Sequence, residues 1–119
     1  MEYGHGWNNE PNRSDVKSVT GSHPAVVGID FSDFSGRSKD QIEKTKDLLR
    51  KNVIDTYERG GITTVSWHFN NPASEGGFYW KDGISTASIA LIKPGGSHHE
   101  EYKKILKSIA DFANSVKTK

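Results

Sequence analysis

The chain has 119 residues, with 16 basic against 15 acidic side chains and a net charge of +1. This balance excludes the strong field that would favour nucleic acid or an anionic membrane. No apolar run of about 18 residues, the length that a membrane-spanning helix needs, is present. There are no cysteines, which excludes disulfides and thiolate metal sites. Residues 1–4 lack the basic and apolar regions of a signal peptide, so we expect no such segment in this chain.

The chain is polar for its size. Hydrophobic residues make up only 33% of the sequence. A domain of this length buries roughly two-thirds of its unfolded surface, so a stable monomer would need a richer core. We therefore expect an incomplete core that something else must cover.

The first half of the chain alternates between strand and helix patterns. Residues 2–4 predict a clipped strand, and Ser14 to Thr20 predict a short helix closed by Gly21. The apolar run from Ala25 to Phe31 is typical of a strand buried on both faces.

A longer helix and another strand follow. Ser38 and Gln41 have the spacing of a capping box, which predicts the start of a helix, and Gly60-Gly61 predict its end. The β-branched run 62–67 predicts a strand. The apolar face of the helix is predicted to contain Ile42, Leu49, Val53 and Tyr57, with Thr45 and Thr56 beside them.

The remainder of the chain is predicted to be a long irregular stretch followed by a helix. The irregular stretch runs from Phe69 to Gly96, and Ser97 is predicted to cap the helix. An apolar stripe at helical spacing is predicted to consist of Tyr102, Ile105, Leu106, Ile109, Phe112, Ala113 and Val116. A further strand is expected just after Lys119.

Three strand–helix units in this order predict an α/β fold with parallel strands. Polar and aromatic residues follow each predicted strand, so they should gather at one edge of the sheet: His5 and Trp7; Asp30, Ser32 and Asp33; His68, Asn70 and Asn71. Barrel enzymes build their sites on that edge, whereas a doubly wound fold would be expected to show a glycine fingerprint, and no GxGxxG occurs. The prediction is a partial (β/α)8 TIM barrel comprising about its first three βα units.

The run from Gly60-Gly61 through Ser66-Trp67-His68 to Asn70-Asn71-Pro72 resembles the signature of glycoside hydrolase family 26. Other pieces in register support the resemblance, namely Tyr3-Gly4-His5, the segments 14–17 and 24–30, and Pro94-Gly95-Gly96 leading into a His-Glu-Glu-Tyr helix. The likeness covers nearly the whole chain. It implies a retaining (β/α)8 hydrolase that acts most often on β-1,4-mannan, with minorities of the family on other β-glycans. The expectation for this chain is an endo-β-1,4-mannanase-like parent enzyme, and the exact polysaccharide and the endo or exo mode stay open.

The resemblance also implies site residues. It predicts that His68 touches the sugar beside the cleavage point and that Trp80, followed by Phe78 and Tyr79, stacks on sugar rings. The substrate-binding set predicted for this chain is His68, Trp80, Trp67, Asn71 and His5. The first strand departs from the family pattern, because Gly4-His5-Gly6-Trp7 stands where Gly-His-Gln is usual, so the role of that loop stays open.

No catalytic residue of the family matches a position in this chain. Retaining hydrolysis needs two carboxyl groups about 5–5.5 Å apart. The family's acid/base glutamate follows the fourth strand and its nucleophile follows the seventh, so both would lie beyond Lys119. The resemblance therefore implies that residues 1–119 are an inactive N-terminal fragment of the catalytic barrel, whether natural, proteolytic or partial. It implies no cofactor and no metal, and a parent enzyme that is secreted, periplasmic or on the cell surface.

Structural alternatives exist for several of these residues. Trp67 could pack within the barrel, Asn70 and Asn71 could serve the turn before Pro72, and the loop aromatics could dock on the barrel. Asp30 and Asp33 could cap a helix or pair with a base such as Arg37. Adjacent His98 and His99 would not converge on a metal.

Two competing functions remain. The chain could be a non-catalytic carbohydrate-binding or scaffold module, or, with less support, a small doubly wound domain with an unrelated ligand. In the fragment interpretation, the open sheet edges must be covered by the remainder of the barrel or by another copy of the chain, because unpaired edges invite pairing.

Overall fold

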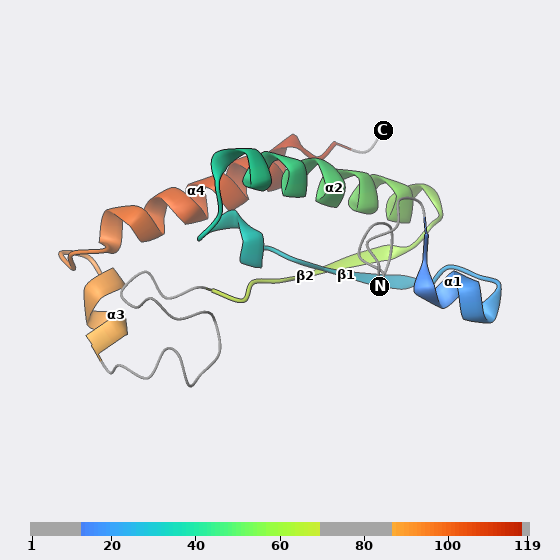
Figure 1. The fold of residues 1–119 in the computed structure, drawn as a ribbon, viewed down its shortest axis with the longest axis horizontal. Coiled ribbons are helices and arrows are strands. Elements are labelled where there is room, and N and C mark those ends of the chain that lie inside the picture. Colours follow the sequence, from blue (N-terminus) through green and yellow to red (C-terminus); the bar gives the residue numbers. More distant parts are fainter. Residues whose placement is uncertain (1–12, 70–86, 118–119) are drawn as a thin grey trace.

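A computed structural model of the chain describes residues 13–69 and 87–117, drawn as a ribbon in Figure 1. The first strand that the sequence predicts, at residues 2–4, lies outside these ranges, so the third βα unit stays a prediction. Within them, no helix is both long and apolar enough to cross a membrane. The elements in chain order are α1 (Asp15–Thr20), β1 (Val26–Asp30), the 3-10 helix η1 (Ser32–Phe34), α2 (Lys39–Glu58), β2 (Ile62–Ser66), α3 (Ala87–Ile92) and α4 (His99–Ser115).

The two described strands pair in parallel, as the sequence predicts. Val26 lies opposite Ile62 at one end of the pair, and Asp30 lies opposite Ser66 at the other. Helix α2 makes the crossover between the strands. Parallel pairing brings both carboxyl ends to the same edge of the sheet, which is the arrangement that a shared site requires.

Local signals explain where the helices begin and end. The Ser14 hydroxyl accepts the backbone N–H of Lys17 at 3.1 Å, and Gly21 closes α1 with a φ of 79°. At the start of α2, Ser38 and Gln41 exchange side-chain and backbone hydrogen bonds in a capping box. Both starts and the glycine stop confirm the sequence predictions, because each depends only on residues a few positions apart.

The core lies between the sheet and the helices α2 and α4, which cover the same side of the sheet in Figure 1. Phe31, Phe34 and Phe112 pack ring against ring, with centroids 4.9 to 5.7 Å apart. Leu49 of α2 is 1% exposed and Ile29 of β1 is 5% exposed. Such pairs of aromatic rings stabilise a core beyond their buried area.

Two sequence predictions near helices α3 and α4 need correction. The stretch from Phe69 to Gly96 is not wholly irregular, because it contains helix α3. Ser97 does not cap α4; His98 occupies that position without a side-chain cap. The backbone N–H of His98 instead bonds to the carbonyl oxygen of Leu91 at 3.0 Å, so the turn between α3 and α4 fixes where α4 begins.

The buried face of α2 is also shifted from its predicted position. Asn52 and Thr56 are each 1% exposed, whereas Tyr57, predicted on the buried face, is 53% exposed. The predicted stripe of α4 is only partly covered, with Phe112 buried and Leu106 39% exposed. Among the described residues, two strands and two long helices cover too little surface to bury every apolar side chain.

Candidate functional site at the strand ends

The site is centred on the carboxylate of Asp30, which is the last residue of β1. The parallel register sets Asp30 opposite Ser66, the last residue of β2. The Ser66 hydroxyl donates a hydrogen bond to Asp30 Oδ2 at 2.7 Å. The backbone N–H of Ser32 donates to Asp30 Oδ1, also at 2.7 Å. The Asp30 carboxylate therefore links the carboxyl end of β2 to the turn that follows β1.

His68 follows β2 and contacts the same carboxylate twice. Its backbone N–H donates to Asp30 Oδ1 at 3.3 Å, and its ring nitrogen Nδ1 bonds to Asp30 Oδ2. The imidazole is 58% exposed, whereas the Asp30 side chain is 29% exposed. The Asp30 side chain is therefore partly buried, whereas the imidazole of His68 is accessible to solvent.

The environment keeps Asp30 ionised. Burial raises the pKa of this carboxyl, but hydrogen bonds from the side chains of Ser66 and His68 and from the backbone N–H groups of Ser32 and His68 outweigh it. Together they lower the pKa of Asp30 from 3.8 to about 2. Hydrogen bonds that favour the charged form have this effect. A negative charge therefore sits at the strand ends at neutral pH.

The site lies on the sheet face opposite α2 and α4. Successive side chains of a strand point to opposite faces, and Val27 and Ile29 of β1 are buried toward the helices. Asp30 is one position after Ile29, so it belongs to the other face, and Ser66 is paired with it. In a closed barrel with helices outside, that other face is the interior.

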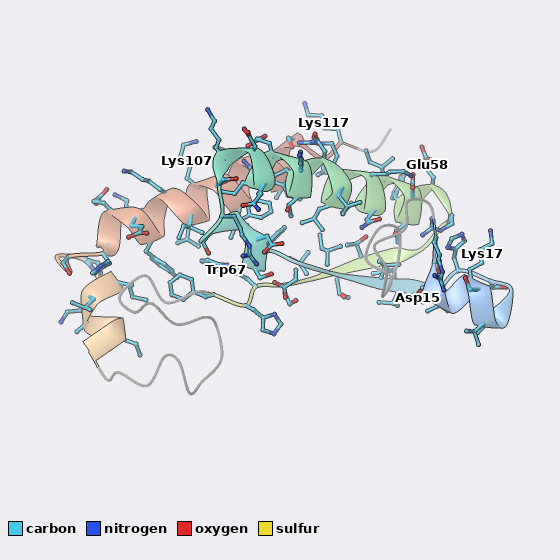
Figure 2. The ribbon with its side chains drawn as sticks, viewed as in Figure 1. Asp15, Lys17, Glu58, Trp67, Lys107 and Lys117 are labelled. Atoms are coloured by element: carbon cyan, nitrogen blue, oxygen red, sulfur yellow. The ribbon has the colours of Figure 1, made fainter. Side chains whose placement is uncertain are left out.

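Trp67, between Ser66 and His68, packs in the opposite direction. Its indole stacks on Tyr102 of α4 at 6.0 Å and contacts Phe69 edge to face at 5.0 Å. The side chain is packed against the core, on the helix side of the sheet (Figure 2). This placement favours the packing alternative for Trp67 that the sequence left open, with the indole serving to anchor the segment that carries His68.

Of the predicted substrate-binding residues, only His68 and Trp67 fall in the described ranges. His5, Asn71 and Trp80 lie outside them, as do Asn70, Phe78 and Tyr79. Asp33 forms an ion pair with Arg37 at 2.9 Å. The prediction that Arg37 pairs with a carboxylate near the strand end is therefore confirmed for Asp33. The basic side chain that contacts Asp30 is that of His68, not Arg37.

Sequence reasoning missed Ser66 as a member of the site. The available signal was that polar residues end both predicted strands and that parallel pairing sets them side by side. In residues 13–69 and 87–117, no group of three or more His, Asp or Glu side chains is arranged to hold a metal. His99 uses its Nδ1 to bond the carbonyl oxygen of Ile92 at 2.8 Å.

A groove of about 370 Å³ opens on the helix side of the sheet beside β2. Its walls are mostly apolar and include Val53 and Tyr57 of α2, Val65 of β2, and Phe112 and Val116 near the end of α4. Val65, on this face, is 57% exposed, and Ile62, at the other end of β2 and on the opposite face, is 64% exposed. Both apolar side chains are thus more than half exposed among the residues that the structure describes.

The chain is similar to enzymes that act on mannan. It is 31% identical over 112 residues to a mannan endo-1,4-beta-mannosidase of Bifidobacterium adolescentis, covering 88% of this chain and 11% of that one. It is 28% identical over 109 residues to the enzyme of the same name from Bacillus subtilis, covering 91% of this chain and 29% of the other. The chain thus spans less than a third of the length of each of these relatives.

Solved structures agree with the sequence comparison. The GH26 beta-mannanase of Bacteroides ovatus matches with a TM-score of 0.77 and 35% identity, over 98% of this chain and 34% of that one. A modular endo-beta-1,4-mannanase of Cellulomonas fimi matches with a TM-score of 0.72 and 33% identity, over 87% of this chain and 24% of that one. The profile of Glycosyl hydrolase family 26 matches residues 2–119. The chain therefore belongs to glycoside hydrolase family 26.

Proposed function

We propose that residues 1–119 form the first βα units of a (β/α)8 retaining β-mannan hydrolase and supply part of its sugar-binding cleft. The two catalytic glutamates would lie outside this chain. The observation that carries the proposal is the joining of Asp30, Ser66 and His68 at the carboxyl ends of two parallel strands, on the face away from the helices. Sites of barrel enzymes lie at these strand ends.

The chemistry of the described site suits binding rather than bond cleavage. Asp30 is occupied by four hydrogen bonds and is tied to Ser66 and His68. Among the described strand-end carboxylates, Asp33 is paired with Arg37. Both carboxylates are thus engaged with side chains of this chain, whereas retaining hydrolysis needs two carboxyl groups about 5–5.5 Å apart that act on the sugar. The exposed imidazole of His68 can hydrogen-bond a sugar hydroxyl.

The uncovered apolar surface supports the proposal that more of a barrel completes the fold. A barrel of this class takes about 250 residues to close. The exposed Ile62 and Val65 and the groove beside them mark the β2 side as the place where the barrel would continue, or where another copy of the chain would dock. Since β-mannan is a polymer too large to enter cells intact, we also infer that the parent enzyme works outside the cytoplasm.

Substitution of His68 in the complete parent enzyme tests the proposal. We expect His68→Ala to lower kcat/KM on β-mannan by about 10- to 100-fold, because a hydrogen bond that a buried sugar makes to the imidazole is lost. The free energy of unfolding should change little, since the ring is largely exposed.

His98→Ala is the matched control, because His98 lies at the start of α4 and not at the strand ends. It should leave kcat/KM unchanged. Normal turnover by the His68 variant would remove His68 from the cleft and defeat the proposal.

A further inference from the structure

We propose that Asp30 is a positioning residue that fixes the tautomer and orientation of the His68 imidazole, so that His68 offers its Nε2 atom as a hydrogen-bond acceptor to a sugar hydroxyl. The identity of the ligand as a sugar rests on the proposed function. The effect of Asp30 on the tautomer and orientation of the imidazole does not depend on it.

His68 is attached twice to one carboxylate, that of Asp30. Asp30 Oδ1 accepts the backbone N–H of His68 at 3.3 Å, and Asp30 Oδ2 contacts the ring Nδ1. A carboxylate that bonds both the backbone and the ring of one residue restricts its side-chain rotation. The imidazole is held in one direction although more than half of its surface is exposed.

The Asp30 carboxylate is itself held in place by hydrogen bonds to both of its oxygens. Ser66 donates to Oδ2 at 2.7 Å from β2, and the Ser32 N–H donates to Oδ1 at 2.7 Å from the turn after β1. Both oxygens are therefore bonded to the protein before the ring of His68 is considered. Because these donors come from the exits of both strands, the orientation of the imidazole is tied to the sheet register.

The ionised state of Asp30 determines which ring nitrogen of His68 carries the proton. An ionised carboxylate only accepts hydrogen bonds, and the pKa of Asp30, lowered to about 2, keeps it ionised at neutral pH. The ring Nδ1 must then carry a proton to bond Oδ2. A neutral imidazole has one ring N–H, and the partner of one nitrogen determines the state of the other. When the imidazole is neutral, Nε2 is therefore the unprotonated nitrogen, and it accepts.

This assignment matters because a histidine in water favours the opposite tautomer, with the proton on Nε2. Without Asp30, the ring would rotate, and its outer nitrogen would more often present a donor. Sugar hydroxyl groups can donate or accept, so the tautomer decides which direction of hydrogen bond His68 selects. Asp30 would thereby act on substrate recognition without touching the substrate.

Nitrogen-15 NMR of the labelled 119-residue chain tests the tautomer directly. Long-range proton–nitrogen spectra, taken at a pH where His68 is neutral, separate protonated from unprotonated ring nitrogens. The His68 signals are assigned by their loss in His68→Gln. We expect Nδ1 to carry the proton in the wild type and the population to move to the Nε2–H form in Asp30→Ala.

Asp33→Ala is the matched control, because Asp33 is also a carboxylate after β1 but pairs with Arg37. It should leave the His68 signals unchanged. An Nε2–H tautomer in the wild type, or an unaltered spectrum in folded Asp30→Ala, would overturn the inference. Should Asp30→Ala lose its fold by circular dichroism, the wild-type tautomer alone decides the matter.

A double-mutant cycle in the parent enzyme separates this inference from the proposed function. If Asp30 acts through His68, Asp30→Ala lowers kcat/KM in the wild-type background by about tenfold but adds little in the His68→Ala background. Losses that simply add would contradict a positioning role. Unchanged mannan turnover in every variant, with the Nδ1–H tautomer intact, would defeat the sugar-binding proposal and leave the Asp30–His68 coupling standing.

Discussion

On the helix side of the sheet, Phe31, Phe34 and Phe112 pack ring against ring, whereas on the other side Asp30, Ser66 and His68 are joined by hydrogen bonds. Neighbouring residues of the same short strands supply both groups, because a strand alternates its side chains between faces. In the described part of the chain, the helix side holds the buried apolar core, whereas the other side carries the polar cluster and the exposed apolar residues Val26 and Ile62. One face holds the fold together, and the other is the face that we propose binds the sugar.

The two faces should respond differently to substitution. Apolar packing depends on filled volume, so loss of a large side chain leaves a cavity and lowers the free energy of unfolding. A polar site depends on direction, so loss of one hydrogen bond changes geometry and recognition more than stability. Substitutions on each face therefore test whether stability and recognition are divided between the two faces.

The largest effect is expected on the helix side. Phe112 is 4% exposed and contacts both Phe31 and Phe34, so Phe112→Ala should lower the free energy of unfolding by about 3–5 kcal/mol. Urea denaturation followed by circular dichroism measures this. Leu106→Ala on the same helix, at a side chain 39% exposed, is the control and should cost much less. Equal losses would mean that the aromatic cluster is not the core.

A smaller effect, dependent on pH, is expected on the open face. The folded-state pKa of Asp30 is lowered from 3.8 to about 2, so its contribution to stability is present above pH 3.8 and is lost as the pH falls through 2. That contribution is about 2 kcal/mol. The difference in unfolding free energy between wild type and Asp30→Asn should therefore shrink by about that amount from pH 5 to pH 2.

Asp33→Asn provides the comparison for this measurement, since its carboxylate makes an exposed ion pair with Arg37 and such pairs contribute about 0–1 kcal/mol. A difference for Asp30→Asn that stays constant across the same pH range would show that the ionised carboxylate is not the stabilising form.

The smallest effect is expected at the uncovered side of β2. Ile62 and Val65 are 64% and 57% exposed, so the isolated chain should self-associate through this region. Val65→Lys should weaken self-association by about tenfold, which corresponds to roughly 1.4 kcal/mol, as sedimentation equilibrium would measure. Val19→Lys in α1, where Val19 is 87% exposed, is the control. A compact wild-type monomer would contradict the idea that this surface requires cover.

Much of the fold was accessible from the sequence because the relevant signals are local. The capping box of Ser38 and Gln41 and the stop at Gly21 each involve residues a few positions apart. Helix α3 was missed because six residues among glycines and serines carry too little periodicity to indicate a helix. The start of α4 was misplaced because backbone bonds from α3, rather than Ser97, determine it.

The site was predicted less completely than the fold. The sequence indicated that Asp30 and His68 share an edge of the sheet, since both follow predicted strands. It could not indicate that they bond to each other, because that contact depends on the register of β1 against β2, and a slip of one residue would send the side chains to opposite faces. The role of Ser66 depends on the same register.

The most direct test of the account is a structure of the complete parent enzyme with a bound β-1,4-mannooligosaccharide. We expect a sugar ring on the sheet face away from α2 and α4, with a hydroxyl oxygen within about 3.2 Å of His68 Nε2 while Nδ1 remains on Asp30. A sugar bound on the helix side of the sheet, or at the ends where β1 and β2 begin, would contradict it.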